Sequence, residues 1–241
     1  MKKLLSIFLT AAMLLSLTAC QTEQPQNLDS SEATESSPTV TEQESAESPL
    51  QPGNEEAQVK TQDGNILVAY FSWADNAILS DDVDAVASPS VVSPGNVQQL
   101  ATWVQEETGG DLFSIQVSEP YSSDWDECLE RANQERGDNA RPQLTANVED
   151  LEKYDTVFLG YPNWWYGVPM ALLTFLEDND LSGKQVYLFC SHGTGGLSNS
   201  VDIITEAVPE AIISDNIFHC YEEDASSSQG DIQSWVAQLG Y

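Results

Sequence analysis

Three short segments of the chain combine the residue types that bind a flat, phosphorylated ligand. They are Ser72-Trp73 together with Gly95-Asn96-Val97, the run Pro162-Asn163-Trp164-Trp165-Tyr166-Gly167, and the run Ser191-His192-Gly193-Thr194-Gly195-Gly196. Backbone N–H groups at the start of a helix bind phosphate, glycine lets a backbone approach a ligand closely, and aromatic rings stack on conjugated systems. The three segments therefore predict a site for a conjugated ligand that carries a phosphate.

The same segments exclude two common nucleotide sites and show no machinery for proton transfer. The chain has no GxxxxGK motif, and no GxGxxG follows its first apolar run, so neither a P-loop nor a dinucleotide-binding turn is expected. No paired acid and base and no activated nucleophile stand out, so the catalytic residues stay unassigned. The chemistry at such a site would be that of a bound cofactor.

Several of these residues have a structural interpretation beside the functional one. Trp164, Trp165 and Tyr166 could be core residues, but three adjacent large rings cannot all face one core, so at least one should be exposed. His192 and Trp73 could equally be structural residues of their loops. The region 73–94 could be a solvated acidic loop or a lid over the site.

The elements that must position these residues are strands and helices in alternation. Apolar runs of strand length occupy 66–71, 112–117, 157–161, 186–190 and, more weakly, 211–219, where Ser214-Asp215-Asn216 interrupts the run. Apolar residues at helical spacing occupy 97–104, 125–132, 168–176, 197–208 and 232–239. The pattern predicts a three-layer α/β domain with a five-stranded parallel sheet. Ligands bind beyond the carboxyl ends of such strands, where the three segments should meet.

The chain resembles the flavodoxin-like family, which binds FMN. The matching residues are Ala69-Tyr70-Phe71-Ser72, Pro94-Gly95-Asn96, Arg141-Pro142, Phe158-Leu159-Gly160-Tyr161-Pro162, Trp164-Trp165, Phe175-Leu176, Leu181-Ser182-Gly183-Lys184 and Ser191-His192-Gly193-Thr194-Gly195-Gly196. The resemblance covers roughly 61–241 and keeps the order of the elements. It implies the strand order 2-1-3-4-5, with the FMN phosphate at the loop after the first strand and the start of the next helix. It places the flavin ring between the loops at 162–167 and 191–196.

The first loop departs from the family pattern, which is rich in Ser and Thr and contains a Gly. Ala74, Asp75 and Ala77 stand in those positions, Val97 replaces the usual Thr, and the insertion 73–94 divides the loop. Ser88, Ser90 or Ser93 could supply the missing hydroxyls. The retained aromatic and glycine-rich loops favour an FMN-dependent oxidoreductase of small acceptors or an electron carrier, with donor and acceptor unidentified. The altered loop favours the alternative, a non-catalytic binding lipoprotein on a flavodoxin scaffold that has lost FMN.

The N-terminus predicts export and lipid attachment. Lys2 and Lys3 precede an apolar run that ends at Leu17-Thr18-Ala19-Cys20, which resembles a bacterial lipobox. We expect a signal peptide at 1–19, a lipidated Cys20, a disordered acidic tether over 20–60 and the flavodoxin-like domain at 61–241. This arrangement places the protein on the extracytoplasmic face of a bacterial membrane, held by the lipid anchor.

Charge and the remaining cysteines and histidines restrict the partners further. The chain carries 39 acidic and 8 basic residues, a net charge of −31, and 61–241 alone has 30 acidic and five basic residues. Nucleic acid is excluded as a partner, because its binding needs a basic surface. Cys190 and Cys220 could form a disulfide outside the cytosol. His192 and His219 are far apart in the sequence, and no metal site is predicted.

Overall fold

The computed structural model describes residues 65–79 and 88–241. The predicted signal peptide, the lipidated Cys20 and the tether over 20–60 lie outside the described residues. So do residues 61–64 of the predicted domain and 80–87 of the insertion. Among the helices of the described part, none has the length and apolar character needed to span a membrane.

The main sheet is parallel and has the predicted order. Its strands are β1 (Ile66–Tyr70), β3 (Asp111–Ser114), β5 (Thr156–Pro162), β6 (Gln185–His192), β7 (Ile212–Ile213) and β8 (Phe218–Tyr221). They lie in the order β3-β1-β5-β6, and both β7 and β8 pair with β6. In chain order this is 2-1-3-4-5, with β7 and β8 sharing the fifth position, so the predicted flavodoxin-like fold is confirmed.

The break in the fifth position lies where the sequence predicted it. The N–H of Asn216 donates to Ser214 Oγ at 3.1 Å, and this local hydrogen bond turns the chain between β7 and β8. The second strand is shorter than predicted, since β3 ends at Ser114. Val117 instead forms an isolated antiparallel bridge with Leu144. The strands nevertheless end at a common edge, as the site requires.

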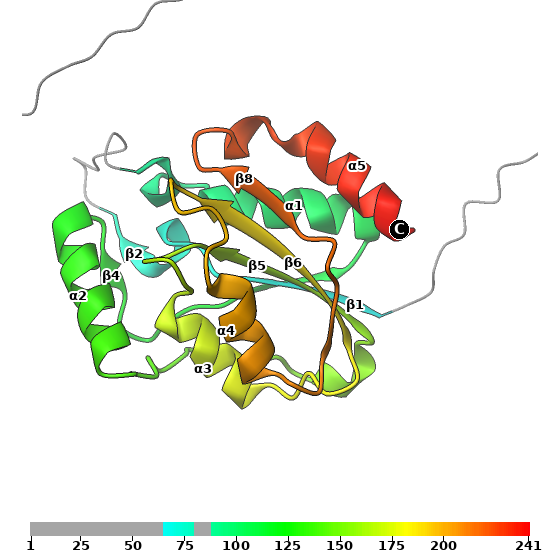
Figure 1. Ribbon diagram of the computed structural model, residues 1–241, viewed down its shortest axis with the longest axis horizontal. Helices are drawn as coiled ribbons and strands as arrows, with labels where there is room; N and C mark the ends of the chain where they lie inside the picture. The colour runs from blue at the N-terminus through cyan, green and yellow to red at the C-terminus, as the bar shows by residue number, and fades with distance from the viewer. Residues whose placement is uncertain (1–64, 80–87) are drawn as a thin grey trace, which may run out of the picture. The chain divides into compact units, whose positions relative to one another are not determined.

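Helices cover both faces of the sheet (Figure 1). They are α1 (Asn96–Thr108), α2 (Trp125–Gly137), α3 (Met170–Asp178), α4 (Ser200–Ala207) and α5 (Gln229–Leu239). The buried residues form two clusters: α1 and α5 pack on Val68 and Phe158 of one face, and α3 and α4 pack on Leu67 and Leu159 of the other. All residues of β1 and β5 are buried. This double coverage explains why both strands are apolar on both faces.

The described parts of the insertion are tied to the domain by side-chain and strand contacts that the sequence did not predict. β2 (Ala77–Ile78) pairs in parallel with β4 (Tyr121–Ser122). The buried amide of Asn76 donates to Ser72 O and Ile115 O, both at 2.9 Å, and accepts from the N–H of Val117 at 2.8 Å. The start of the insertion therefore has a fixed position beside the carboxyl edge of the sheet.

Candidate cofactor-binding site

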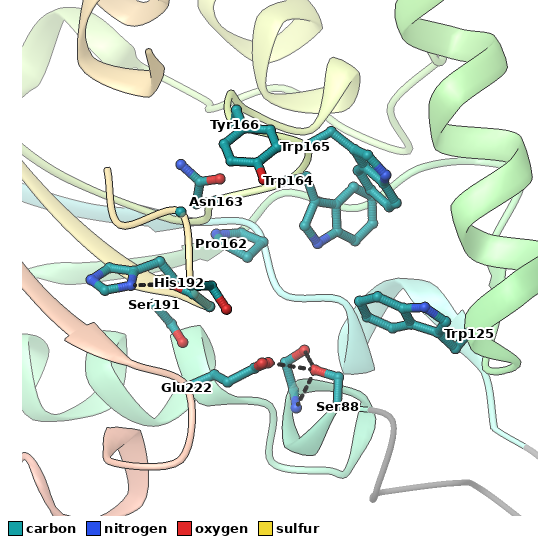
Figure 2. Close-up of a pocket in the computed structure, with 14 residues that line it drawn as sticks. Ser88, Trp125, Pro162, Asn163, Trp164, Trp165, Tyr166, Ser191, His192 and Glu222 are labelled. Carbon is teal, nitrogen blue, oxygen red and sulfur yellow. Dashed lines mark hydrogen bonds between the residues drawn. The ribbon is translucent and has the colours of Figure 1, made fainter. Parts of the chain in front are cut away.

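A pocket lies beyond the carboxyl ends of β5 and β6, with a volume of about 270 Å³. It is lined by Ser88, Ser90, Trp125, Pro162, Asn163, Trp164, Trp165, Tyr166, Ser191, His192, Gly193, Thr194, Gly195 and Glu222. Figure 2 shows Trp164, Trp165 and Tyr166 on one side and Ser88 and Glu222 on the opposite side. The predicted loops at 162–167 and 191–196 thus meet at one pocket, which has an aromatic side and a polar side.

The aromatic side is built on a tight turn with unusual backbone angles. Trp164 and Gly167 exchange backbone hydrogen bonds, and between them Trp165 and Tyr166 have φ angles of 51° and 63°. This left-handed conformation is uncommon for residues other than glycine and costs roughly 1–3 kcal/mol each. Arg136 Nη1 donates to Trp165 O at 2.8 Å, and the N–H of Asn199 donates to Tyr166 O at 3.2 Å. These two bonds hold the strained turn in place from α2 and from the start of α4.

The three aromatic rings of this turn differ in burial, as expected. Trp164 packs edge-on against Phe71 and Tyr121. Tyr166 is 65% exposed. A Cβ placed on Gly195 would lie 3.0 Å from Tyr166 Cδ1, so the Tyr166 ring lies directly over this glycine. The glycine-rich turn therefore makes room for a ring at the mouth of the pocket.

Trp125 completes the aromatic side, although the sequence analysis did not assign it to the site. It begins α2, is 40% exposed and contacts Trp73 edge to face. Trp73 itself is only 2% exposed and donates its indole N–H to Ser122 O at 3.1 Å. Trp73 was predicted to bind the cofactor, but it lies behind Trp125 and Trp164 and does not line the pocket.

The polar side is formed by the end of the insertion and the end of β8. Ser88 Oγ donates to Glu222 Oε2 at 2.7 Å and lies 2.6 Å from Ser90 Oγ. Ser88 and Ser90 were considered as hydroxyl donors in the sequence analysis, whereas Glu222 was not. The edge rule for parallel sheets could have identified Glu222, because it directly follows the fifth strand position.

The start of α1 lies beneath this polar side. Ser72 Oγ is buried and has no hydrogen-bond partner. A Cβ on Gly95, which precedes α1, would lie 2.2 Å from this oxygen and 3.1 Å from Ser90 O. Asn96 donates its amide to Ser191 Oγ at 3.3 Å and to Glu222 O at 2.8 Å. The side chain of Val97 is in the core. These predicted residues therefore support the pocket from below, and Gly167 and Gly196 also stay outside its lining.

No lysine or arginine lines the pocket. Arg131, Arg141 and Lys153 form ion pairs with Glu135, Glu177 and Asp111. Arg136 and Lys184 donate to backbone oxygens. An anion in this pocket must therefore be bound by hydroxyl and backbone N–H groups rather than by a cationic side chain.

His192 and His219 are adjacent in space although they are 27 positions apart in the sequence. His192 Nε2 lies 3.0 Å from His219 Nδ1, and His192 Nδ1 lies 2.9 Å from Gly193 O. Burial, together with the neighbouring His192, lowers the pKa of His219. At least one of the two facing nitrogens must lack a proton, so the hydrogen-bonded pair does not carry two positive charges. Within the described residues no group of three ligands could hold a metal ion.

Cys190 and Cys220 are both free, so the disulfide considered from the sequence is not formed. In the register of β6 and β8, Cys220 is opposite Ser191, and Cys190 is opposite His219. Neighbouring residues along a strand point to opposite faces. The two thiols therefore lie on different sides of the sheet, and burial raises the pKa of Cys220 to about 11.

The fold is a doubly wound α/β fold with a pocket at the carboxyl edge of the sheet, which is where ligands bind in such folds. Residues 83–239 match the family model described as Flavodoxin, and the chain belongs to this family. Membership supports FMN as the cofactor, as the resemblance implied. The predicted family is confirmed.

Individual relatives agree with this assignment. A flavodoxin from Haemophilus influenzae is 25% identical over 118 residues, which are 47% of this chain and 52% of the relative. Flavodoxin 1 of Escherichia coli K12 is 28% identical over 99 residues, 39% of this chain and 42% of the relative. The chain spans about half the length of the curated relatives it matches.

Two solved structures have the same fold. A candidate flavoprotein from Bacteroides eggerthii is 26% identical, with a TM-score of 0.56, covering 74% of this chain and 99% of that one. A second, from Bacteroides uniformis, is 25% identical with a TM-score of 0.56, covering 72% and 98%.

Proposed function

We propose that the chain binds FMN in the pocket beyond the carboxyl ends of β5 and β6 and uses it for electron transfer or for the reduction of small acceptors. When bound, FMN supplies the redox chemistry, since it accepts and donates electrons at its ring. The observation that carries the proposal is the buried Ser72 hydroxyl without a partner at the start of α1. A buried polar group of this kind is rare unless a ligand or water satisfies it.

The residues of the pocket fit both ends of FMN. On the polar side, Ser88 and Ser90 offer hydroxyl groups in the lining. Beneath them, Ser72 offers a third hydroxyl close to Gly95 and the first N–H groups of α1, which no intrahelical bond uses. On the other side, Trp165, Tyr166 and Trp125 offer faces for a conjugated ring. The protein would bind and orient the cofactor with these groups and exclude water from one side of its ring.

A binding experiment tests this proposal. The purified protein should bind FMN with a stoichiometry of one and a flavin absorption spectrum that differs from that of free FMN. Equilibrium dialysis at micromolar FMN measures the stoichiometry. If the protein retains no flavin, the alternative applies, and the chain is a non-catalytic binding lipoprotein on a flavodoxin scaffold. Oxidation of NAD(P)H with and without an added quinone-like acceptor then separates an oxidoreductase from an electron carrier.

We also propose that the protein is held at the extracytoplasmic face of a bacterial membrane by a lipid on Cys20. The support is the lipobox-like sequence at 17–20 and the net charge of −31, which opposes attachment to anionic headgroups. Cys20→Ser should move the protein from the membrane fraction to the soluble fraction of fractionated cells. Cys128→Ser, which changes a buried thiol of α2, is the control and should stay in the membrane. Retention of Cys20→Ser after a salt wash would rule out the lipid as the sole anchor.

A further inference from the structure

We propose that Glu222 determines the specificity of the pocket between phosphorylated and unphosphorylated flavins, an inference that rests on the proposed flavin site. Among the described residues that line the pocket, Glu222 has the one acidic side chain, and its carboxylate lies on the polar side. Ser88 Oγ donates to Glu222 Oε2 at 2.7 Å, and Ser90 Oγ lies 2.6 Å from Ser88 Oγ. The carboxylate therefore already uses a hydroxyl that a phosphate would need.

The position of Glu222 is fixed by its backbone. Its N–H donates to His192 O at 2.8 Å, and its carbonyl accepts from the buried amide of Asn96, also at 2.8 Å. Asn96 is the first residue of α1, so Glu222 is attached directly to the start of the helix where the phosphate is expected. The side chain can rotate, but these two backbone hydrogen bonds keep its carboxylate close to the pocket.

No lysine or arginine side chain compensates for this charge among the described residues that line the pocket. The groups that can oppose it are the His192 ring and the N–H groups at the start of α1. The carboxylate accepts a hydrogen bond from Ser88. A Cβ on Gly193 of the glycine-rich turn would lie 3.4 Å from Glu222 Oε1, so the carboxylate also lies close to this turn. A phosphate bound at Ser88 and Ser90 would therefore lie close to a like charge, which disfavours binding more strongly in a partly buried site than in water.

Riboflavin separates this effect from the rest of flavin recognition, because it has the same ring and ribityl chain but no phosphate. Without an opposing charge, several charge-assisted hydrogen bonds to the phosphate would make FMN bind more tightly than riboflavin by about a thousandfold or more. With Glu222 in place, we expect the wild-type protein to favour FMN over riboflavin by less than about tenfold. Glu222 thus makes the pocket tolerant of the unphosphorylated cofactor.

The test compares dissociation constants of FMN and riboflavin by fluorescence titration of the full chain and two variants. Glu222→Gln keeps the size of the side chain and an oxygen that can accept from Ser88, but it removes the charge. It should tighten FMN binding by about a hundredfold and leave riboflavin binding unchanged. The control Glu223→Gln makes the same change of charge on the exposed neighbouring residue and should leave both constants unchanged.

Competition with inorganic phosphate gives a second readout: with FMN kept well below its dissociation constant, phosphate should displace it from Glu222→Gln at a lower concentration than from wild type. Two results would overturn the inference: an FMN preference above about a thousandfold in wild type, or an unchanged preference in Glu222→Gln that still binds riboflavin. The first needs no variant and so does not depend on how Glu222→Gln folds. Failure of wild type to bind either flavin would instead contradict the proposed function.

Discussion

Gly160→Ala should lower the free energy of unfolding by about 3 kcal/mol, because the new methyl group overlaps a fixed aromatic ring. Gly160 lies in β5, directly opposite Phe189 of β6. An added Cβ would lie 2.2 Å from Phe189 Cε2 and 2.3 Å from Cζ. Phe189 is fully buried and contacts Trp235 of α5, so its ring cannot move aside without disturbing that helix. Urea denaturation measures the change.

Gly137→Ala is the matched control for this substitution. Gly137 is the last residue of α2, and a Cβ placed there meets no atom within 4 Å. Alanine in a helix should leave the stability unchanged or raise it by roughly 0.5–1 kcal/mol. If Gly160→Ala lost no more stability than this control, the close packing of β5 against Phe189 would be refuted.

The sequence predicts the sheet well because its strands are buried on both faces. The runs at 66–71, 157–161 and 186–190 correspond to β1, β5 and β6, and the break at 214–216 separates β7 from β8. Strands covered by helices on both sides have a continuous apolar sequence, which polar residues interrupt at the ends. The edge rule then places 162–167 and 191–196 together, as the pocket shows.

The residues that the sequence missed depend on contacts between distant segments. Glu222 joins the site through Ser88, which is 134 residues away in the chain, and His192 meets His219 across two strands. The edge rule places Glu222 at the carboxyl edge of the sheet, but no sequence pattern signals its pairing with Ser88 or the pairing of the two histidines. Trp73 is the opposite case: its place after the first strand suggested the pocket, but it is 2% exposed beside β2, β4 and Trp125, which favours the structural interpretation that the sequence left open. The insertion determines the outcome for Glu222, which contacts its Ser88, and for Trp73, which is part of it. Its sequence alone does not show which of its residues face the pocket.

Trp165→Ala should weaken FMN binding by roughly tenfold to a hundredfold, the range of about 1–3 kcal/mol seen when a base loses an aromatic partner. Trp165 lines the pocket and is only partly buried. Its backbone is held by Arg136 through the carbonyl oxygen, a bond that alanine keeps. Alanine, like tryptophan, has a Cβ and is strained at the φ of 51° found at position 165. The substitution therefore removes the ring without relieving the strain of the turn. Fluorescence titration measures the dissociation constant.

Trp103→Ala distinguishes loss of the ring contact from general destabilisation. Trp103 lies in α1, packs against the core cluster beneath α1 and α5, and does not line the pocket. Trp103→Ala should reduce the free energy of unfolding while leaving the FMN dissociation constant within about twofold of that of wild type. Equal weakening in the two variants would mean that binding follows the stability of the domain. A selective effect of Trp165→Ala would instead show that the ring, beyond its edge-on contact with Trp164, provides an aromatic face to the flavin, which the strained turn holds at the pocket.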